Sequence, residues 1–173
     1  MDRCQECGFE YDLARAESAG AGIVAGAARF AAVLRADTAE LRRRPGPATW
    51  SPLEYGCHVR DVLTVQRERV LTARRTDRPS FEPMGRDERV DHDGYAQQDP
   101  AAVARQLTDA AALLANVLAR LDAPDWERRV EYGYPARLER SLRWVGVHTL
   151  HEVRHHLEDV RRQLAPSAGS GSA

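Results

Sequence analysis

The apolar positions of this chain recur with helical spacing in four long segments. The first segment runs from about Ser18 to Arg43, where the sequence 45–47 (Pro-Gly-Pro) ends it. Its three- and four-residue steps are typical of one buried helix face, and they are made by Ile23, Ala27, Phe30, Leu34 and Leu41. No segment shows the sustained alternation of a strand, so the pattern predicts an all-α fold.

The second segment has a clear start signal. Ser51 is followed by Pro52 and, three residues after Ser51, by Glu54. This order is typical of an N-cap, a proline at the first helical position and a capping-box carboxylate. We expect the helix to continue to about Arg74. The charged, proline-containing segment 76–94 is then predicted to be a long loop that could cover a site.

The third and fourth segments begin in similar ways. Asp99 followed by Pro100 repeats the start signal, and apolar positions continue to Leu121. Ser141 is the expected N-cap of a last helix that runs to about Leu164. The connections are too long for a minimal up-and-down bundle. The sequence therefore predicts a four-helix bundle with long loops that cross its ends.

Composition limits the class of protein. At 173 residues and 43% apolar content, one domain over residues 16–165 is expected, with an N-terminal arm over 1–15 and a disordered tail over 166–173. The net charge of −1 gives no excess of positive charge for nucleic acid. We found no apolar run of roughly 18 residues and no signal peptide, so no membrane partner and a cytoplasmic location are expected.

The three cysteines, Cys4, Cys7 and Cys57, are too few for a disulfide scaffold and favour a reducing compartment. The Cys4-x-x-Cys7 spacing is typical of half a zinc knuckle or of a redox pair. A four-ligand zinc site needs two further ligands, and only one other thiol is present. A plain reduced arm is therefore the favoured interpretation, with an ordered metal site and a reactive dithiol as alternatives.

Histidines are concentrated on the last predicted helix. It carries His148, His151, His155 and His156, and His58 lies at the margin of the apolar face of the second helix. Since His151 and His155 are four residues apart, both imidazoles could reach one ion. The helical wheel places these two off the apolar stripe and places His156 near it. His151 and His155 are then either exposed surface residues or part of the lining of an open cleft beside His58.

Two motifs resemble the DinB-like superfamily. The run 50–63 resembles its Trp-Ser-x-x-Glu-x-x-x-His segment, the run 150–160 resembles its closing His-x-x-x-His helix, and the likeness covers most of residues 23–164. It implies a four-helix bundle that binds one divalent metal ion, zinc or nickel, through His58, His151 and His155, with His148 and His156 as neighbours. Glu54 and Asp61, like Asp159, lie one helical turn from these ligands and could orient their imidazoles.

The resemblance also suggests a reaction. Relatives in this superfamily include mycothiol-dependent maleylpyruvate isomerase and bacillithiol transferases, which implies a metal-dependent transferase or isomerase that uses a low-molecular-weight thiol on a small electrophile. The absence of lysine and the abundance of arginine and alanine favour mycothiol. Candidate contacts to an anionic substrate are Arg60, Arg154, Tyr132 and Tyr134. A non-catalytic metal-binding or stress-related sensor protein is the alternative, as a monomer or a homodimer.

Overall fold

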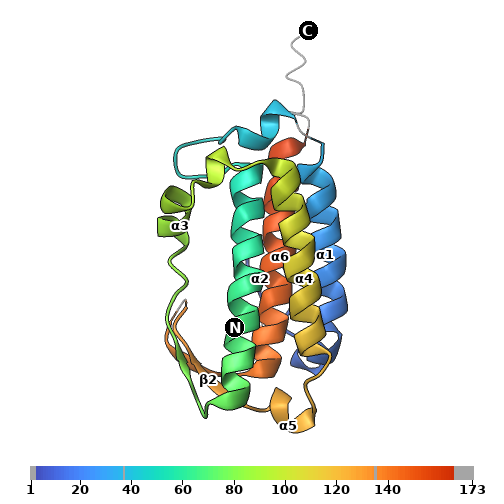
Figure 1. Ribbon diagram of the computed structural model, residues 1–173, viewed down its shortest axis with the longest axis vertical. Coiled ribbons are helices and arrows are strands. Elements are labelled where there is room, and N and C mark those ends of the chain that lie inside the picture. The colour runs from blue at the N-terminus through green and yellow to red at the C-terminus, as the bar shows by residue number, and fades with distance from the viewer. Residues whose placement is uncertain (1–2, 37, 135, 166–173) are drawn as a thin grey trace.

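The computed structural model describes residues 3–36, 38–134 and 136–165, and four long helices dominate it (Figure 1). They are α1 (Ala19–Leu34), α2 (Pro52–Arg75), α4 (Pro100–Leu118) and α6 (Leu142–Leu164). The predicted four-helix bundle is confirmed. A short helix, η1 (Leu13–Ser18), precedes α1. The connecting segments contain the shorter helices η2 (Ala39–Arg42), α3 (Arg86–His92), η3 (Tyr95–Gln97) and α5 (Ala123–Trp126).

The order of the helices in space differs from their order in the chain. Helices α1 and α2 each pack mainly against α4 and α6, so α1 and α2 are diagonal to one another. Helices α2 and α4 run in the same direction, and the chain between them returns along the whole length of the bundle (Figure 1). This long return segment, residues 76–99, carries β1 (Ser80–Phe81), α3 and η3.

The predicted helix starts are confirmed. The Ser51 hydroxyl accepts a hydrogen bond from the Glu54 amide at 3.3 Å, and the Glu54 carboxylate accepts one from the Ser51 amide at 2.8 Å. Asp99 caps α4 and Ser141 caps α6 through their side chains. These caps satisfy amides that a helix cannot pair internally, which is why the signals are readable from local sequence.

The first predicted helix is divided. Helix α1 ends at Leu34 instead of continuing to Arg43, and the extended backbone of Thr38 separates it from η2. Leu41 still reaches the core from η2 and is 1% exposed. The apolar spacing therefore predicted the burial of Leu41 correctly, although the segment does not form one continuous helix.

A small sheet lies at one end of the bundle, where no strand was predicted. Its order is β1-β2-β3, with β1 parallel to β2 (Arg129–Tyr132) and β2 antiparallel to β3 (Leu138–Ser141). Strand β2 does alternate between exposed and buried residues, but only over four positions, the shortest run that indicates a strand, and the other two strands lack such alternation.

One helical stretch among the described residues, Leu13–Leu34, is long and apolar enough by length and composition to cross a membrane. In the structure most of it forms α1, and Ile23, Phe30 and Leu34 are fully buried in the bundle core. Packing within the bundle thus accounts for its apolar face. The predicted disordered tail, 166–173, lies outside the described residues.

The close approach of α1 to α6 gives a stability prediction. A Cβ atom added at Gly26 would lie 2.6 Å from Cγ1 of Val153, a β-branched, fully buried side chain. Overpacking costs about 1–3 kcal/mol, against a gain of about 1 kcal/mol in helix propensity. We expect Gly26→Ala to lower the free energy of unfolding in urea. Gly20→Ala is the control, because its Cβ would meet Ala115 at an ordinary 3.5 Å, and its stability should be unchanged or higher.

Candidate metal centre

Helix α6 presents its polar side chains in two adjacent rows. His148, Glu152 and His156 follow one another at four-residue steps, and the neighbouring row contains His151 and His155. Residues four apart lie on the same face of a helix. The rows meet different parts of the protein, because Glu152 and His156 lie with His58 of α2, whereas His151 and His155 lie with the N-terminal arm.

The first group joins α6 to α2. His58 from α2, Glu152 and His156 each offer a ligand atom, and these atoms lie within 4.8 Å of one another. An oxygen of Glu152, Oε2, lies 3.9 Å from Nε2 of His58 and 3.6 Å from Nε2 of His156. Two imidazoles and one carboxylate, converging from two helices, form a suitable donor set for a divalent transition metal.

Neighbouring groups fix the imidazole of His156. Its Nδ1 lies 3.0 Å from Oδ2 of Asp159, and its ring stacks on Tyr55 at 5.1 Å between centroids. A carboxylate on the far nitrogen is the usual arrangement for a metal-binding histidine, because it selects the tautomer and orients the ring. Burial opposes protonation of His156, but Asp159 and Glu152 together raise its pKa to about 9.

His58 differs from His156, because its surroundings favour the neutral imidazole. It is 4% exposed, and its Nδ1 is buried and has no hydrogen-bond partner among the described residues. Burial lowers the pKa of His58, although Glu152 acts against this. Burial likewise disfavours charge on Glu152, yet the surrounding histidines hold its pKa well below the usual value. A neutral imidazole beside an ionised carboxylate is the protonation state that a metal ion requires.

His148 lies beside the group formed by His58, Glu152 and His156. It stacks on Trp144 at 4.4 Å between ring centroids, and its Nδ1 lies 3.0 Å from the hydroxyl of Tyr11. Burial lowers its pKa to about 4, so the ring is neutral near pH 7. Its Nε2 lies 3.8 Å from Oε1 of Glu152.

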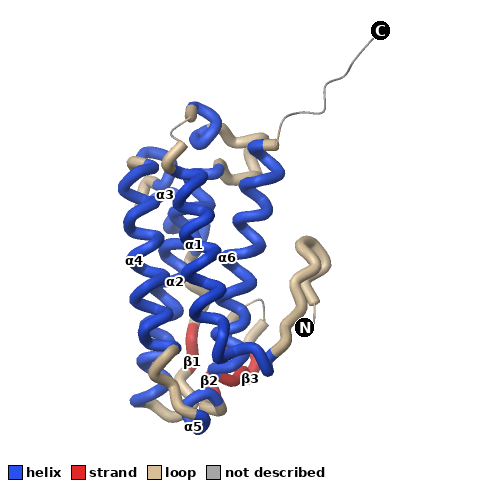
Figure 2. The backbone as a smooth tube through the Cα atoms, turned by 90° about the vertical axis from the view of Figure 1, so that its right-hand side faces the viewer, coloured by secondary structure: helices blue, strands red, loops and turns tan. Residues whose placement is uncertain are grey.

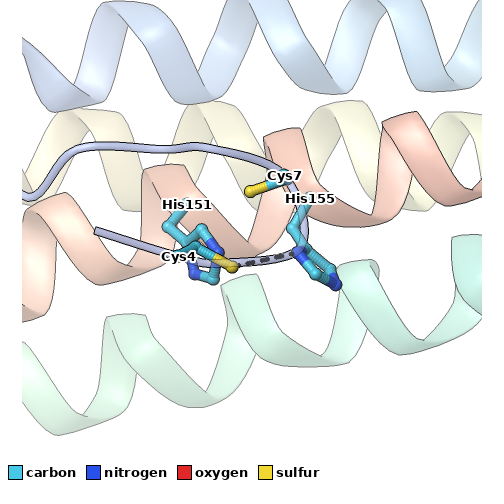
Figure 3. Close-up of side chains that lie close together, drawn as sticks. All are labelled: Cys4, Cys7, His151 and His155. Carbon is cyan, nitrogen blue, oxygen red and sulfur yellow. Dashed lines mark hydrogen bonds between the residues drawn. The ribbon is translucent and has the colours of Figure 1, made fainter.

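The second group joins α6 to the N-terminal arm, which lies along the outside of α6 (Figure 2). Cys4, Cys7, His151 and His155 offer ligand atoms that all lie within 4.8 Å of one another. Figure 3 shows both sulfur atoms beside the two imidazoles, with Sγ of Cys4 3.7 Å from Nδ1 of His155.

The three predicted ligands are therefore divided between two groups. His151 and His155 do lie together, as their spacing implied, but with Cys4 and Cys7. His58 lies with Glu152 and His156 instead. Among the described residues, no group of potential ligands contains His58, His151 and His155 together. That triad stays a prediction, and the geometry offers the His58 group as another ligand set.

Of the residues expected to orient imidazoles, only Asp159 contacts one. Glu54 completes the capping box and pairs with Arg44. Asp61 accepts a hydrogen bond from the Tyr95 hydroxyl at 2.6 Å and so fixes η3 against α2. Both carboxylates have structural partners away from the histidines.

The candidate substrate contacts also have varied surroundings. Arg60 donates to Gln98 and Gln106 and so ties α2 to the start of α4. The hydroxyl of Tyr132 accepts hydrogen bonds from Gln66 and Arg69. The remaining two lie nearer the surface: Arg154 stands 5.7 Å from the ring centroid of Phe9, and Tyr134 is 46% exposed.

Sequence reasoning missed Glu152 and treated His156 as a neighbour. Their signal was present as the His-x-x-x-Glu-x-x-x-His spacing of residues 148, 152 and 156. The position of His156 near the apolar stripe was also informative, because the stripe is the side of α6 that faces the rest of the bundle. Tyr11 had no local signal, since it meets α6 only through the folded arm.

Comparisons with known proteins agree with this architecture. A sequence profile of the DinB superfamily matches residues 23–160. The fold is similar to that of YfiT from Bacillus subtilis, described as a probable metal-dependent hydrolase with an unusual four-helix bundle topology; the TM-score is 0.76 at 13% identity, over 89% of this chain and 90% of YfiT. A search of curated proteins found no match. Because the family profile spans most of the bundle, the chain belongs to the DinB superfamily.

Proposed function

We propose that this protein is a metal-dependent enzyme in which His58, Glu152 and His156 hold one divalent ion. The expected nucleophile is a low-molecular-weight thiol such as mycothiol, and the expected electrophile is a small molecule. The observation that carries the proposal is the position of the Glu152 carboxylate between the Nε2 atoms of two histidines from different helices.

Three protein ligands favour catalysis over a purely structural role. A structural zinc site usually has four protein ligands, whereas a catalytic site keeps a position open for water or substrate. A divalent ion of this kind lowers the pKa of a coordinated water or thiol and so supplies a nucleophile near neutral pH. A group completed by further protein ligands would instead favour the non-catalytic alternative.

The surroundings of the group suggest how a substrate would be held. The ring of Trp50 lies 5.1 Å from that of His58, and the guanidinium of Arg86 lies 5.8 Å from the Trp50 ring centroid. Arg86 also lies 6.0 Å from the ring of Tyr134. An aromatic face with a cation above it suits an anionic molecule that carries an apolar part. We therefore assign substrate contact to Arg86 and Tyr134 in place of Arg60.

Water is the competing nucleophile, and YfiT is described as a probable metal-dependent hydrolase. The two possibilities differ in what they consume. A thiol transferase loses activity when thiol is omitted, whereas a hydrolase does not. Assays of the metal-loaded protein with and without thiol, on the same electrophile, therefore separate them.

Removal of a single ligand should abolish metal binding at this site and should abolish turnover. We expect His58→Ala, Glu152→Gln and His156→Ala each to lose one metal ion per chain, measured by elemental analysis, because each removes one of three converging donors. Activity with a small electrophile should fall with the metal content.

His92→Ala is the matched control, because His92 is exposed on α3 and belongs to none of the ligand groups. It should keep both metal and activity, and circular dichroism should show the same helix content in all four variants. Full metal content in the three ligand variants would contradict the proposal.

The metal-free protein should show a defined pH dependence. Since the folded pKa of His156 is about 9 and the ordinary value is 6.5, its contribution to stability is fully present below pH 6.5 and is lost as pH rises through about 9. The contribution is about 3 kcal/mol at its largest. With a chelator present, the difference in unfolding free energy between wild type and His156→Ala should shrink from pH 6.5 to pH 9.5. An unchanged difference would exclude a raised pKa.

A further inference from the structure

The arm carries a set of donors that the proposed enzyme site does not use. We propose that Cys4, Cys7, His151 and His155 form a second, closed metal site that takes a zinc ion and fastens the N-terminal arm to α6. This site is separate from the His58 group and has a structural role. Its donors come from segments about 150 positions apart in the chain, so the ion would bridge parts of the protein that local folding does not bring together.

The spacing of the donors suits zinc. Bonds of about 2.3 Å to sulfur and about 2.0 Å to nitrogen place neighbouring ligand atoms of a tetrahedron roughly 3.3–3.8 Å apart. The distance from Sγ of Cys4 to Nδ1 of His155 is 3.7 Å, and all four ligand atoms lie within 4.8 Å of one another. Shifts of about 1 Å or less would complete the tetrahedron.

The backbone of the arm is arranged to support thiolates. Backbone amides at Glu6 and Cys7 act to lower the pKa of Cys4, and the amide at Phe9 acts in the same direction on the pKa of Cys7. The turn is closed by a hydrogen bond of 2.9 Å from the Gly8 amide to the Cys4 carbonyl, and Gly8 has a φ of +71°. A side chain at this position would be strained, which explains the glycine after the second cysteine.

Electrostatics also favour a cation here. Burial disfavours the Cys4 thiolate, but the two backbone amides and the side chains of His151 and Cys7 lower its pKa to about 6. Burial and the adjacent Cys4 raise the pKa of Cys7. One divalent cation would neutralise two thiolates and leave the site without net charge, so both cysteines could ionise.

His151 and His155 each have one ring nitrogen in contact with a residue of the arm. Nδ1 of His151 lies 2.9 Å from the Tyr11 hydroxyl, and its buried Nε2 has no hydrogen-bond partner among the described residues. Nε2 of His155 lies 3.3 Å from a carboxylate oxygen of Glu6, which leaves Nδ1 toward Cys4. Each ring thus has one nitrogen fixed by the arm and one available to an ion, as in metal sites with oriented ligands.

A zinc ion here would also shape the neighbouring site. It would hold the arm in the position where the ring of Phe9 packs against His151 and the hydroxyl of Tyr11 reaches His148. His148 lies beside Glu152, so the arm supplies part of the wall of the enzyme site. Two sulfur and two nitrogen donors fill all four zinc positions, which suits a structural rather than a catalytic ion.

Metal stoichiometry combined with cobalt spectroscopy tests the proposal on the full chain. Wild type should bind two ions, and its cobalt form should show a thiolate-to-metal charge-transfer band, because only this site contains thiolates. Cys4→Ser with Cys7→Ser should bind one ion and lose the band, and hydrogen exchange of residues 3–12 should become faster. His58→Ala should also bind one ion but keep the band, so failure of this site is distinguishable from failure of the enzyme site.

Cys57→Ser is the control for loss of a thiol, because Cys57 is buried on α2 next to Tyr95, away from the arm. It should keep two ions and the band. The proposal is overturned if wild-type cobalt protein shows no thiolate band, or if the double cysteine variant keeps its metal content. It is also overturned if Cys4 and Cys7 form a disulfide in protein purified under reducing conditions with zinc present.

Discussion

The contact of the half-buried Glu152 carboxylate with the surrounding histidines is the interaction on which the polar interior of this bundle depends. An ionised carboxylate removed from water is costly unless other polar groups compensate it. Glu152 has ring nitrogens at 3.5–3.9 Å, and they come from His58, His148, His151 and His156. These histidines belong to α2 and α6, so the carboxylate links the two helices through polar groups.

The path of the chain creates the space for such a cluster. Because α2 and α4 are parallel, the return segment 76–99 runs outside the bundle, and its helix α3 brings Arg86 over Trp50. The arm occupies another part of the surface and brings Tyr11 to His148 and His151. The histidines are therefore enclosed by segments that lie far apart in the sequence.

The two rows of α6 suit two kinds of chemistry. The row of Glu152 and His156 faces α2, where one further histidine completes three donors, one fewer than a closed zinc site has. The row of His151 and His155 faces the arm, where two cysteines complete four. Under the two proposals, one helix carries an open site and a closed site side by side, and the closed site holds part of the wall of the open one. Asp159 connects them, because its Oδ2 lies 3.0 Å from His156 and 3.5 Å from His155.

Local sequence determined the helices and their beginnings, since the caps at Ser51, Asp99 and Ser141 act through amides only two or three residues away. It also determined which histidines share a face of α6, because that follows from helical periodicity. Tertiary structure decided which face meets α2. Periodicity within one helix does not tell how a neighbouring helix is rotated about its own axis. The pairing of His58 with Glu152 and His156 could therefore not be predicted from the sequence. The same holds for the arm: the contact between Cys4 and His155 spans 151 positions, and only the folded bundle brings those two residues together.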